Sequence, residues 1–554
     1  MSAISEFDYV VVGAGSAGCL LANRLSANPD NRVLLIEAGD PDTYPWIHIP
    51  VGYLYCIGNA RTDWMYQTEP AKGLNGRTLI YPRGKALGGC TSINGMIYMR
   101  GQARDYDNWA KLTGEDAWNW ENCLKDFKAH EDHYRLDNGA DPKRADGSNF
   151  SDLHGHGGEW RIEKQRLSWD VLDSFADAAE QTGVEKTDDF NAGDNSGVGY
   201  FDVNQRKGWR WNASKAFLNS IKSRPNLTIW TRSTVDSLTF AQSEDGKTIC
   251  SGACINKDGS KIEIRTTKEV ILSAGAINSP KILQLSGIGP ADLLKSKGID
   301  VVLDAPAVGE NLQDHLQIRA IYKVSNTRTL NTLTNSLVGK VKIGLEYMFK
   351  RSGPMSMSPS QLGAFTRSDA DKEHANLEYH IQPLSLEAFG EDLHDFPAIT
   401  VSVCNLNPTS RGHVRIKSAD PSEPPEIAPN YLDTDEDRKI AADSLRQVRD
   451  IMGQNAMQPH EPIEYKPGIQ YQSDEELAKL AGDIASTIFH PVGTVKMGKE
   501  DDPTAVLDPH LRVKGIGGLR VVDASIMPEI TSGNTSSPII MIAEKASRWI
   551  LAGQ

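Results

Sequence analysis

A glycine-rich run near the start of the chain constrains the fold more than any other feature of the sequence. Gly13, Gly15 and Gly18 stand between an apolar run of strand length at residues 7–12 and an apolar helical pattern at residues 17–25. Glycines at this spacing permit a tight turn and let the backbone approach a pyrophosphate closely, while the N-terminus of the following helix offers amide groups and a positive dipole end. On its own, the pattern also occurs in ordinary strand-to-helix turns.

The residues that follow narrow this interpretation. Glu37 closes a second apolar run at residues 32–36 and lies 19 residues beyond Gly18, where a carboxylate can accept hydrogen bonds from ribose hydroxyls. The order strand, helix, strand is typical of a parallel α/β sheet. We therefore predict a dinucleotide-binding site that includes Ser16 and Ala38, and the acidic residue favours FAD or NAD over NADP.

Composition and charge exclude several classes of protein. The 554 residues are 39% hydrophobic, which provides for a large core, and the formal net charge of -14 would repel a nucleic-acid backbone. No apolar run reaches the roughly 20 residues of a membrane span, and the first residues lack the basic start and apolar core of a signal peptide. Seven cysteines without a CxxC pair suit a reducing compartment. We expect a cytoplasmic protein with no transmembrane segment and no nucleic-acid partner; peripheral contact with the inner face of a membrane stays open.

The middle of the chain divides into regions of different pattern. Residues 46–106 are rich in Gly, Pro, Tyr and Asn with little periodicity, as expected of a long loop that covers or carries a site. Residues 138–158 form a polar, Gly-rich connection. From about residue 319 to residue 425 the strand-helix rhythm gives way to alternating stretches such as residues 413–418, which predict a separate antiparallel sheet.

The C-terminal part returns to an α/β pattern. Residues 473–488 predict a helix that begins with a capping box formed by Ser473 and Glu476. Residues 519–522 predict a strand, and residues 538–551 predict a helix with proline at its first position. The sequence contains no internal repeat and no low-complexity tract.

A second glycine-rich segment makes the sequence resemble a known family. Residues 84–94 (GKALGGCTSIN) place two adjacent glycines before small residues, which lets the backbone approach a flat or anionic group closely. This segment resembles a signature segment of the glucose-methanol-choline (GMC) oxidoreductases. Further segments of that family, in the same order along the chain, resemble residues 275–289, 308–315 and 518–525. The resemblance covers nearly the whole chain and is greatest to the bacterial choline dehydrogenase-like and FAD-dependent alcohol dehydrogenases.

The resemblance implies a two-part α/β architecture. An FAD-binding, Rossmann-like domain of the GMC/PHBH type would comprise residues 1–159, 216–315 and 481–554. A discontinuous α+β substrate-binding domain, built on an antiparallel sheet, would comprise residues 160–215 and 316–480. The first domain would hold the ADP half of FAD at the N-terminal glycines.

The resemblance also implies a cofactor and its contacts. Some members attach flavin through a histidine, but Ile93 occupies the matching position here, so we expect FAD to bind without a covalent link. No metal is expected, because His154 and His156 alone supply too few ligands. Besides the N-terminal motif, the residues implied as FAD contacts are Trp64, Arg83, Gly84, Gly89, Asn94, Gly95, Met96, Val235, Ala274, Asp523, Ala524, Asn534 and Thr535.

Two residues are candidates for catalysis. Oxidation of an alcohol needs a base for the hydroxyl proton, and imidazole suits that task because its pKa lies near neutrality. His490 follows the predicted helix 473–488, at a helix end that favours imidazolium, and it matches the catalytic histidine of the family; a packed or capping histidine is the alternative. Asn534 matches the second member of the family's catalytic pair, and its amide can bind the substrate oxygen, whereas a helix cap is its alternative role. His315, beside Asp314, is interpreted as part of a structural turn.

The resemblance implies an FAD-dependent enzyme that oxidises a primary alcohol to an aldehyde and passes the electrons to a quinone or another acceptor. An oxidase that uses oxygen is the close alternative, and the motifs do not separate the two. A nicotinamide dehydrogenase would leave residues 84–94 and 275–289 unexplained. A lyase on the same fold would not require the pair of His490 and Asn534, and a flavoprotein without catalysis would bind FAD that no alcohol bleaches. The identity of the alcohol stays open, because the pocket is built from the least recognisable segments.

Overall fold

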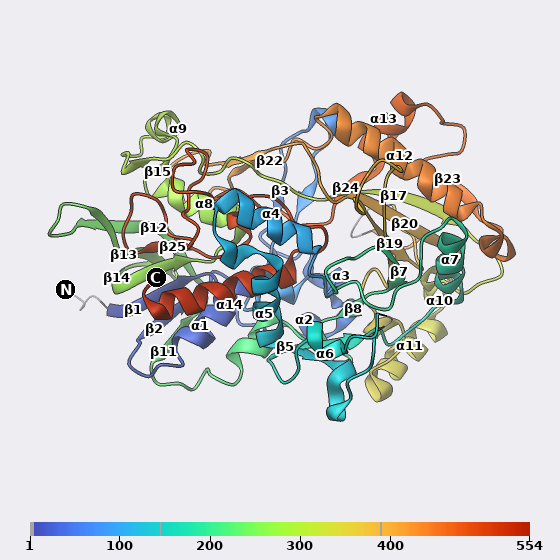
Figure 1. The fold of residues 1–554 in the computed structure, drawn as a ribbon, viewed down its shortest axis with the longest axis horizontal. Helices are drawn as coiled ribbons and strands as arrows, with labels where there is room; N and C mark the ends of the chain where they lie inside the picture. Colours follow the sequence, from blue (N-terminus) through green and yellow to red (C-terminus); the bar gives the residue numbers. More distant parts are fainter. Residues whose placement is uncertain (1–4, 145, 388–390) are drawn as a thin grey trace.

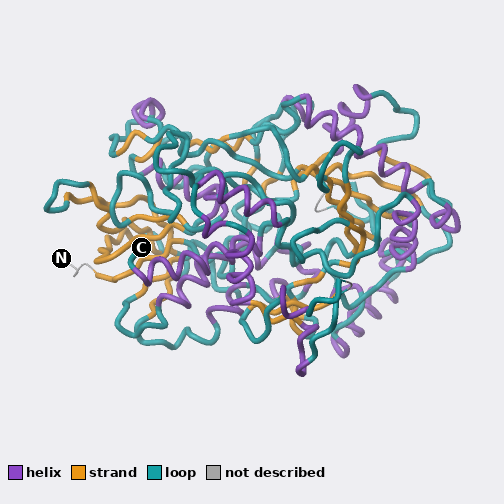
Figure 2. The backbone as a smooth tube through the Cα atoms, viewed as in Figure 1, coloured by secondary structure: helices purple, strands orange, loops and turns teal. Residues whose placement is uncertain are grey.

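The computed structural model describes residues 5–144, 146–387 and 391–554 and contains two large sheets, one toward each end of the long axis (Figure 1). Figure 2 shows the strands gathered mainly in these two groups, with loops and helices around them. The first sheet is mixed and mainly parallel at its centre, and the second is antiparallel. This arrangement confirms the predicted α/β fold class, while the predicted domain boundaries stay predictions.

The first sheet is built around the strand that carries the N-terminal glycine motif. In sheet order its strands are β11 (Leu227–Trp230), β2 (Val33–Ile36), β1 (Ser5–Val12), β14 (Ser260–Leu272), β13 (Thr248–Lys257) and β12 (Ser233–Gln242), and β25 (Leu519–Val521) also pairs with β14. The pairs of β1 with β2, β1 with β14, β2 with β11 and β14 with β25 are parallel. The strands β12 and β13 extend β14 in antiparallel fashion. The predicted strand, helix and strand at the N-terminus are therefore confirmed.

Helices cover this sheet, some in direct contact with its strands and others packed on those helices. The main ones are α1 (Ser16–Leu25), α5 (Trp120–His130), α8 (Gly275–Leu285) and α14 (Ser536–Ala552). α1 contacts β1 and β2, and α14 packs on α1. A Cβ atom on Gly18 would lie 1.8 Å from the carbonyl oxygen of Gly13, so only glycine permits this close approach of α1 to the preceding turn. Leu20, Leu21 and Leu25 of α1 are fully buried in the core, as their spacing predicts.

The second sheet has one apolar and one polar face. In sheet order its strands are β23 (Ile463–Lys466), β17 (Leu316–Lys323), β20 (Ala398–Asn405), β19 (Leu377–Gln382), β18 (Leu362–Thr366) and β7 (Gly197–Tyr200), and β24 (Ala485–Thr487) also pairs with β17. Residues such as Ile318, Tyr379 and Val401 form a core with helices α7 (Asp170–Gln181), α12 (Asp435–Met452) and α13 (Asp474–Ile484). Because side chains alternate along a strand, Gln317 and His380 face the opposite side.

Further elements lie between these. The other α-helices of the described residues are α2 (Pro45–His48), α3 (Tyr53–Cys56), α4 (Ala103–Thr113), α6 (Phe150–Leu153), α9 (Ala291–Ser296), α10 (Leu330–Thr334) and α11 (Leu337–Lys350). The other strands are β3 (Tyr66–Gln67), β4 (Ile80–Tyr81), β5 (Glu131–His133), β6 (Trp160–Lys164), β8 (Asp202–Val203), β9 (Gln205–Arg206), β10 (Trp209–Arg210), β15 (Ile288–Gly289), β16 (Leu303–Asp304), β21 (His413–Arg415) and β22 (Glu426–Ala428). Within the described residues, no helix has both the length and the apolar composition needed to cross a bilayer.

Three predicted elements differ from the structure. The helix predicted at residues 473–488 starts at its capping box but ends at Ile484, because the next three residues pair with β17 as β24. This strand lies in a segment that the sequence assigns to the FAD-binding domain. The strand predicted at residues 413–418 belongs to a separate two-stranded sheet of β21 and β22. The C-terminal helix begins at Ser536, so Pro538 is its third residue rather than its first.

Candidate active site

A cavity of about 760 Å³ extends from the first sheet to the second. Its volume falls within the range of about 300–1,000 Å³ typical of ligand and cofactor sites. Gly13, Glu37 and Val235 lie at one end, and Gln317 and His490 line the other. All the residues predicted from the sequence for the site line this cavity except Gly18, which packs α1 instead. Their individual roles stay predictions.

Glycines shape the end of the cavity at the first sheet. Gly13 has φ of +100°, and a Cβ atom there would lie 2.5 Å from the carbonyl oxygen of Ser273. A Cβ atom on Gly15 would meet nothing within 4 Å, because its Cα faces the open cavity, and no side chain caps the amides of α1 beside it. Gly89 approaches so closely that its own Cβ would lie 2.7 Å from the Cα of Gly15. The backbone thus leaves room and free amide groups for a pyrophosphate.

Glu37 fits the ribose end of a dinucleotide. Its carboxyl group accepts hydrogen bonds from the backbone N–H of Ala14 (2.9 Å) and of Gly39 (2.8 Å). Burial raises the pKa of Glu37 to about 7, although these two bonds act in the opposite direction. A carboxyl group has more acceptor positions than these two bonds use, so Glu37 can still accept from ribose hydroxyls.

The N-terminus of α14 fits the flavin end. Asn534, Thr535 and Ser536 line the cavity, and no side chain caps the first amides of this helix. The Oδ1 atom of Asn534 and the Oγ atom of Ser536 are buried without a hydrogen-bond partner among the described residues. Buried polar atoms are rarely left unpaired, and a helix N-terminus favours negative charge. The residues at both ends of the cavity therefore fit FAD.

A strained loop directs His490 into the cavity. The carboxylate of Asp314 accepts hydrogen bonds from the backbone N–H of His490 (2.7 Å) and the hydroxyl of Thr487 (2.6 Å). Phe489 has φ of +71°, a region that bulky residues rarely adopt, and Arg83 donates a hydrogen bond to its carbonyl oxygen (2.7 Å). Such strain persists only where the surroundings enforce it. The hydrogen bonds made by Asp314 and Arg83 therefore hold His490 in position.

The predicted stabilisation of imidazolium at His490 is wrong. The helix ends at Ile484 and a strand follows, so no helix C-terminus lies at the histidine. Instead, burial and the nearby groups His315, His380 and Arg83 lower the pKa of His490 well below its ordinary value. The imidazole is therefore neutral at neutral pH and keeps one unprotonated ring nitrogen.

The hydrogen bonds around His490 determine which ring nitrogen carries the proton. The Nε2 atom of His315 lies 3.1 Å from the carbonyl oxygen of Leu406, which can only accept, so this nitrogen carries a proton. Burial lowers the pKa of His315, and its neutral ring then has a lone pair at Nδ1, which lies 3.0 Å from the Nδ1 of His490. His490 must therefore donate through Nδ1 and carry its lone pair at Nε2. The side-chain amide of Asn534 donates to that Nε2 at 3.1 Å.

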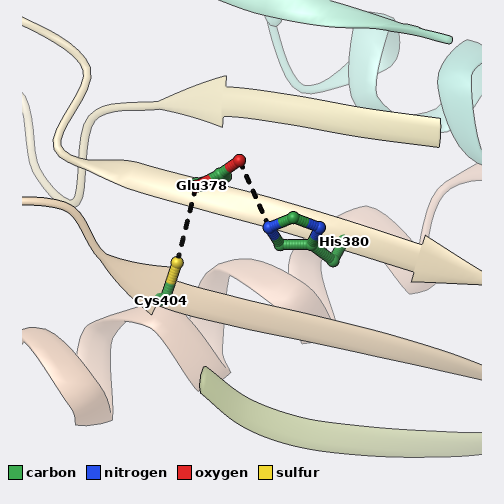
Figure 3. Close-up of side chains that lie close together, drawn as sticks. All are labelled: Glu378, His380 and Cys404. Carbon is green, nitrogen blue, oxygen red and sulfur yellow. Dashed lines mark hydrogen bonds and ion pairs between the residues drawn. The ribbon is translucent and has the colours of Figure 1, made fainter. Parts of the chain in front are cut away.

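The polar face of the second sheet forms the opposite wall of the cavity. Gln317, His380 and Gln382 line this wall. Behind them, Glu378 lies 3.2 Å from the Nε2 atom of His380, and Cys404 donates a hydrogen bond from its thiol to the same carboxylate (Figure 3). Burial and the charge of Glu378 hold the pKa of the Cys404 thiol well above its ordinary value. This end of the cavity therefore offers amides and an imidazole backed by a buried carboxylate.

Within residues 5–144, 146–387 and 391–554, two groups of side chains have the donor atoms of a metal site. One is Glu378, His380 and Cys404, and the other is Asp132, Asp137 and His156; in each group the donor atoms lie within 4.8 Å of one another. Cys404 carries a proton, whereas metals bind the thiolate.

His154 and His156, from which no metal site is expected, contact different carboxylates. His154 Nε2 lies 3.2 Å from Asp189, whereas His156 Nδ1 lies 3.2 Å from Asp132. The absence of a metal stays a prediction.

Sequence reasoning missed part of the site. It treated Asp314 and His315 as a structural turn, but both contact His490. Their position just before a strand of the predicted antiparallel sheet could have indicated that they lie at the site. It also missed the polar wall, although Glu378, His380 and Gln382 occupy alternate positions of one strand.

Comparisons with known proteins give one consistent family. Residues 7–317 and 408–543 match sequence models described as GMC oxidoreductase. The chain is 40% identical to the alcohol dehydrogenase (acceptor) of Pseudomonas putida, over 98% of this chain and 96% of that protein. It is 38% identical to the oxygen-dependent choline dehydrogenase of Staphylococcus aureus (strain MSSA476), over 98% of this chain and 93% of that protein.

Solved structures agree with this assignment. Pyridoxine 4-oxidase from Mesorbium loti has a TM-score of 0.86 and 32% identity, with 98% of each chain covered. Formate oxidase of Aspergillus oryzae RIB40 has a TM-score of 0.90 and 26% identity, with 99% of each chain covered. The family model covers more than half of the chain, and the relatives cover nearly all of it. The chain therefore belongs to the GMC oxidoreductases, a family of FAD-dependent enzymes, and is an oxidoreductase acting on CH–OH donors.

Proposed function

We propose that this chain oxidises a primary alcohol to an aldehyde with non-covalently bound FAD and passes the electrons to a quinone or another acceptor that is not oxygen. The observation that carries the proposal is the pair of His490 and Asn534, an unprotonated imidazole nitrogen 3.1 Å from an amide in the wall of the cavity. The relatives named alcohol dehydrogenase (acceptor) and choline dehydrogenase support the class of substrate.

The residues of the cavity divide the reaction between them. Bound FAD would supply the group that accepts hydride from the alcohol carbon. The alcohol oxygen replaces Nε2 of His490 as the acceptor of the Asn534 amide N–H, and the hydroxyl proton passes to the Nε2 that is released. A base of low pKa suffices for this step, because the hydroxyl becomes strongly acidic as hydride leaves the carbon. The imidazolium that results still donates through Nδ1 to His315, so the hydrogen bond at 3.0 Å survives proton transfer.

The non-covalent attachment of FAD rests on Ile93. This side chain lines the cavity in the position where some family members carry the linking histidine, and it has no group that can form such a bond. Acid precipitation of the purified protein should release all of the flavin as intact FAD into the supernatant. Flavin that remains with the pellet would contradict this part of the proposal.

The alcohol and the acceptor are tested in one experiment. Anaerobic mixing with a panel of aliphatic, aromatic and quaternary ammonium alcohols should bleach the flavin with at least one of them. The reduced enzyme is then mixed with either a water-soluble quinone or dissolved oxygen, and we expect faster reoxidation by the quinone. The oxidase alternative, favoured by the likeness to pyridoxine 4-oxidase, predicts the reverse order. Bleaching by no alcohol would refute the proposed function.

We also propose a cytoplasmic location. All seven cysteines lie within the described residues and none forms a disulfide. Free thiols of this kind suit a reducing compartment. Fractionation of the source cells, with the protein followed by antibody, tests this location, and recovery of the protein outside the cell would contradict it.

A further inference from the structure

Helix α11 lies at the edge of the molecule (Figure 1), and most of its large apolar side chains are exposed. Tyr347 is its only buried residue, and its hydroxyl donates a hydrogen bond to the carbonyl oxygen of Gly208 (2.9 Å). Six large apolar side chains of the helix are exposed, namely Leu337 (82%), Val338 (64%), Val341 (59%), Leu345 (46%), Met348 (60%) and Phe349 (78%). Such a concentration of exposed apolar residues marks an interaction surface.

The six side chains form one stripe. At about 100° per residue they occupy a continuous arc of about 120° on the helix. Tyr347 and the half-buried Ile343 lie on the opposite side, toward the protein. The apolar face of α11 thus points away from the core, the reverse of the usual orientation of a surface helix.

The charge around the stripe is positive, although the chain as a whole is acidic. Lys340 and Lys342 flank the stripe, and Lys350 and the C-cap residue Arg351, which packs over Trp209, lie at the end of the helix. These four positive charges face one negative charge at Glu346, whereas the whole chain carries a formal net charge of -14. A second copy of this chain would bring two positive surfaces together. A surface of negative charge would attract this helix while it repels most of the rest of the protein.

The stripe lies near one wall of the cavity. α11 contacts the short helix Pro354–Ser356, which contacts the helix Pro50–Gly52. The latter leads directly into α3, where Leu54 and Tyr55 are exposed and Tyr53 lines the cavity. A surface that binds α11 would therefore lie on the same side of the molecule as this part of the cavity.

We propose that α11 docks this protein on a membrane surface that contains anionic lipids. The side chains of the stripe project singly from a convex helix, so they can enter the boundary between headgroups and acyl chains while the lysines contact lipid phosphates. The docked protein holds its α3 side close to the bilayer. This proposal is independent of the catalytic roles given to His490 and Asn534.

Co-sedimentation of the full-length, FAD-loaded protein with lipid vesicles tests this docking. The protein should sediment with vesicles of phosphatidylcholine and phosphatidylglycerol, and less with phosphatidylcholine alone. The double variant Leu337→Asp/Phe349→Asp should lower the partition coefficient at least about tenfold. Ile463→Asp/Ile469→Asp is the matched control, because these residues are 65% and 61% exposed outside α11, and it should bind like the parent.

The outcomes separate docking from folding and from self-association. Both double variants should keep FAD and the parental rate of flavin reduction by a water-soluble alcohol, since none of the four residues lines the cavity. Lys340→Glu/Lys342→Glu should weaken only the binding to anionic vesicles. A parent protein that sediments with neither vesicle, or a Leu337→Asp/Phe349→Asp protein that sediments like the parent, overturns the proposal. A parent dimer that this variant converts to a monomer in analytical ultracentrifugation assigns the stripe to a second copy and also overturns it.

Discussion

Replacement of His315 tests whether the proton of His490 is positioned from outside the cavity. His315 is fully buried, donates to Leu406 through Nε2 and offers a lone pair to His490 at 3.0 Å. His315→Phe keeps a ring of similar size but removes both nitrogen atoms. The Nδ1–H of His490 then has no acceptor, and the imidazole is more stable with its proton on Nε2, where it cannot accept the proton of the alcohol.

The size of the effect follows from the lost hydrogen bond. A buried donor left without its acceptor costs about 1–3 kcal/mol, and about 1.4 kcal/mol corresponds to a factor of ten in the population of the competent tautomer. The limiting rate of flavin reduction in His315→Phe should therefore fall by about 5-fold to 150-fold. His315→Gln retains a carbonyl oxygen that can accept from His490, so its loss should be smaller.

Anaerobic stopped-flow reduction at saturating alcohol measures this rate directly. The FAD content and the melting temperature of each variant serve as controls, because the carbonyl group of Leu406 also loses its donor in His315→Phe. A His315→Phe enzyme that loads FAD and is reduced at the parental rate would refute the tautomer argument. Equal losses in the Phe and Gln variants would assign His315 to packing instead.

Three further predictions concern the base and the cofactor. His490→Ala should lower the limiting rate of flavin reduction by about 10²–10⁴-fold with FAD retained. Asn534→Ala should lower this rate less, because the base stays in place. A stable, yellow His490→Ala enzyme that is reduced at the parental rate would remove His490 from the mechanism. Gly15→Val should prevent FAD loading, since its side chain would enter the open space at this glycine, and a variant that purifies with full flavin absorbance would contradict this. A base acts only when neutral, and because the pKa of His490 is lowered well below 6.5, the limiting rate should stay level from about pH 8 to about pH 6. A fall centred near pH 6.5 in the parent, absent from the reduction kinetics of His490→Ala, would show an ordinary pKa.

The parts of the fold that depend on neighbouring residues could be predicted from the sequence. The β1–α1–β2 unit with Gly13 and Glu37 is one example, because its turn, helix start and strand lie within a short stretch of chain. The capping box of Ser473 and Glu476 is another, and both partners are bonded as expected. Such features need no knowledge of distant partners.

The parts that depend on distant partners could not be predicted in the same way. The stretch Ala485–Thr487 continues a helical pattern in the sequence, yet it becomes a strand because β17 offers an edge to pair with. This change moves His490 from a helix end to a loop held by Asp314, and it reverses the expected direction of its pKa. An error of a few residues in a boundary thus altered the chemistry expected of the base.

The polar wall of the cavity shows a different limit of sequence reasoning. In β19, Glu378, His380 and Gln382 alternate with Tyr379 and Ile381, a pattern that in an antiparallel sheet ordinarily means one face in the core and one in water. Here the polar face is buried as well, because it closes the cavity opposite the nucleotide-binding sheet. The period of the pattern fixes which residues share a face, but only the packing of the second sheet onto the first decides whether that face meets solvent or substrate. The side chains that line this wall of the cavity are therefore ones that the sequence pattern would assign to an ordinary solvent-exposed surface.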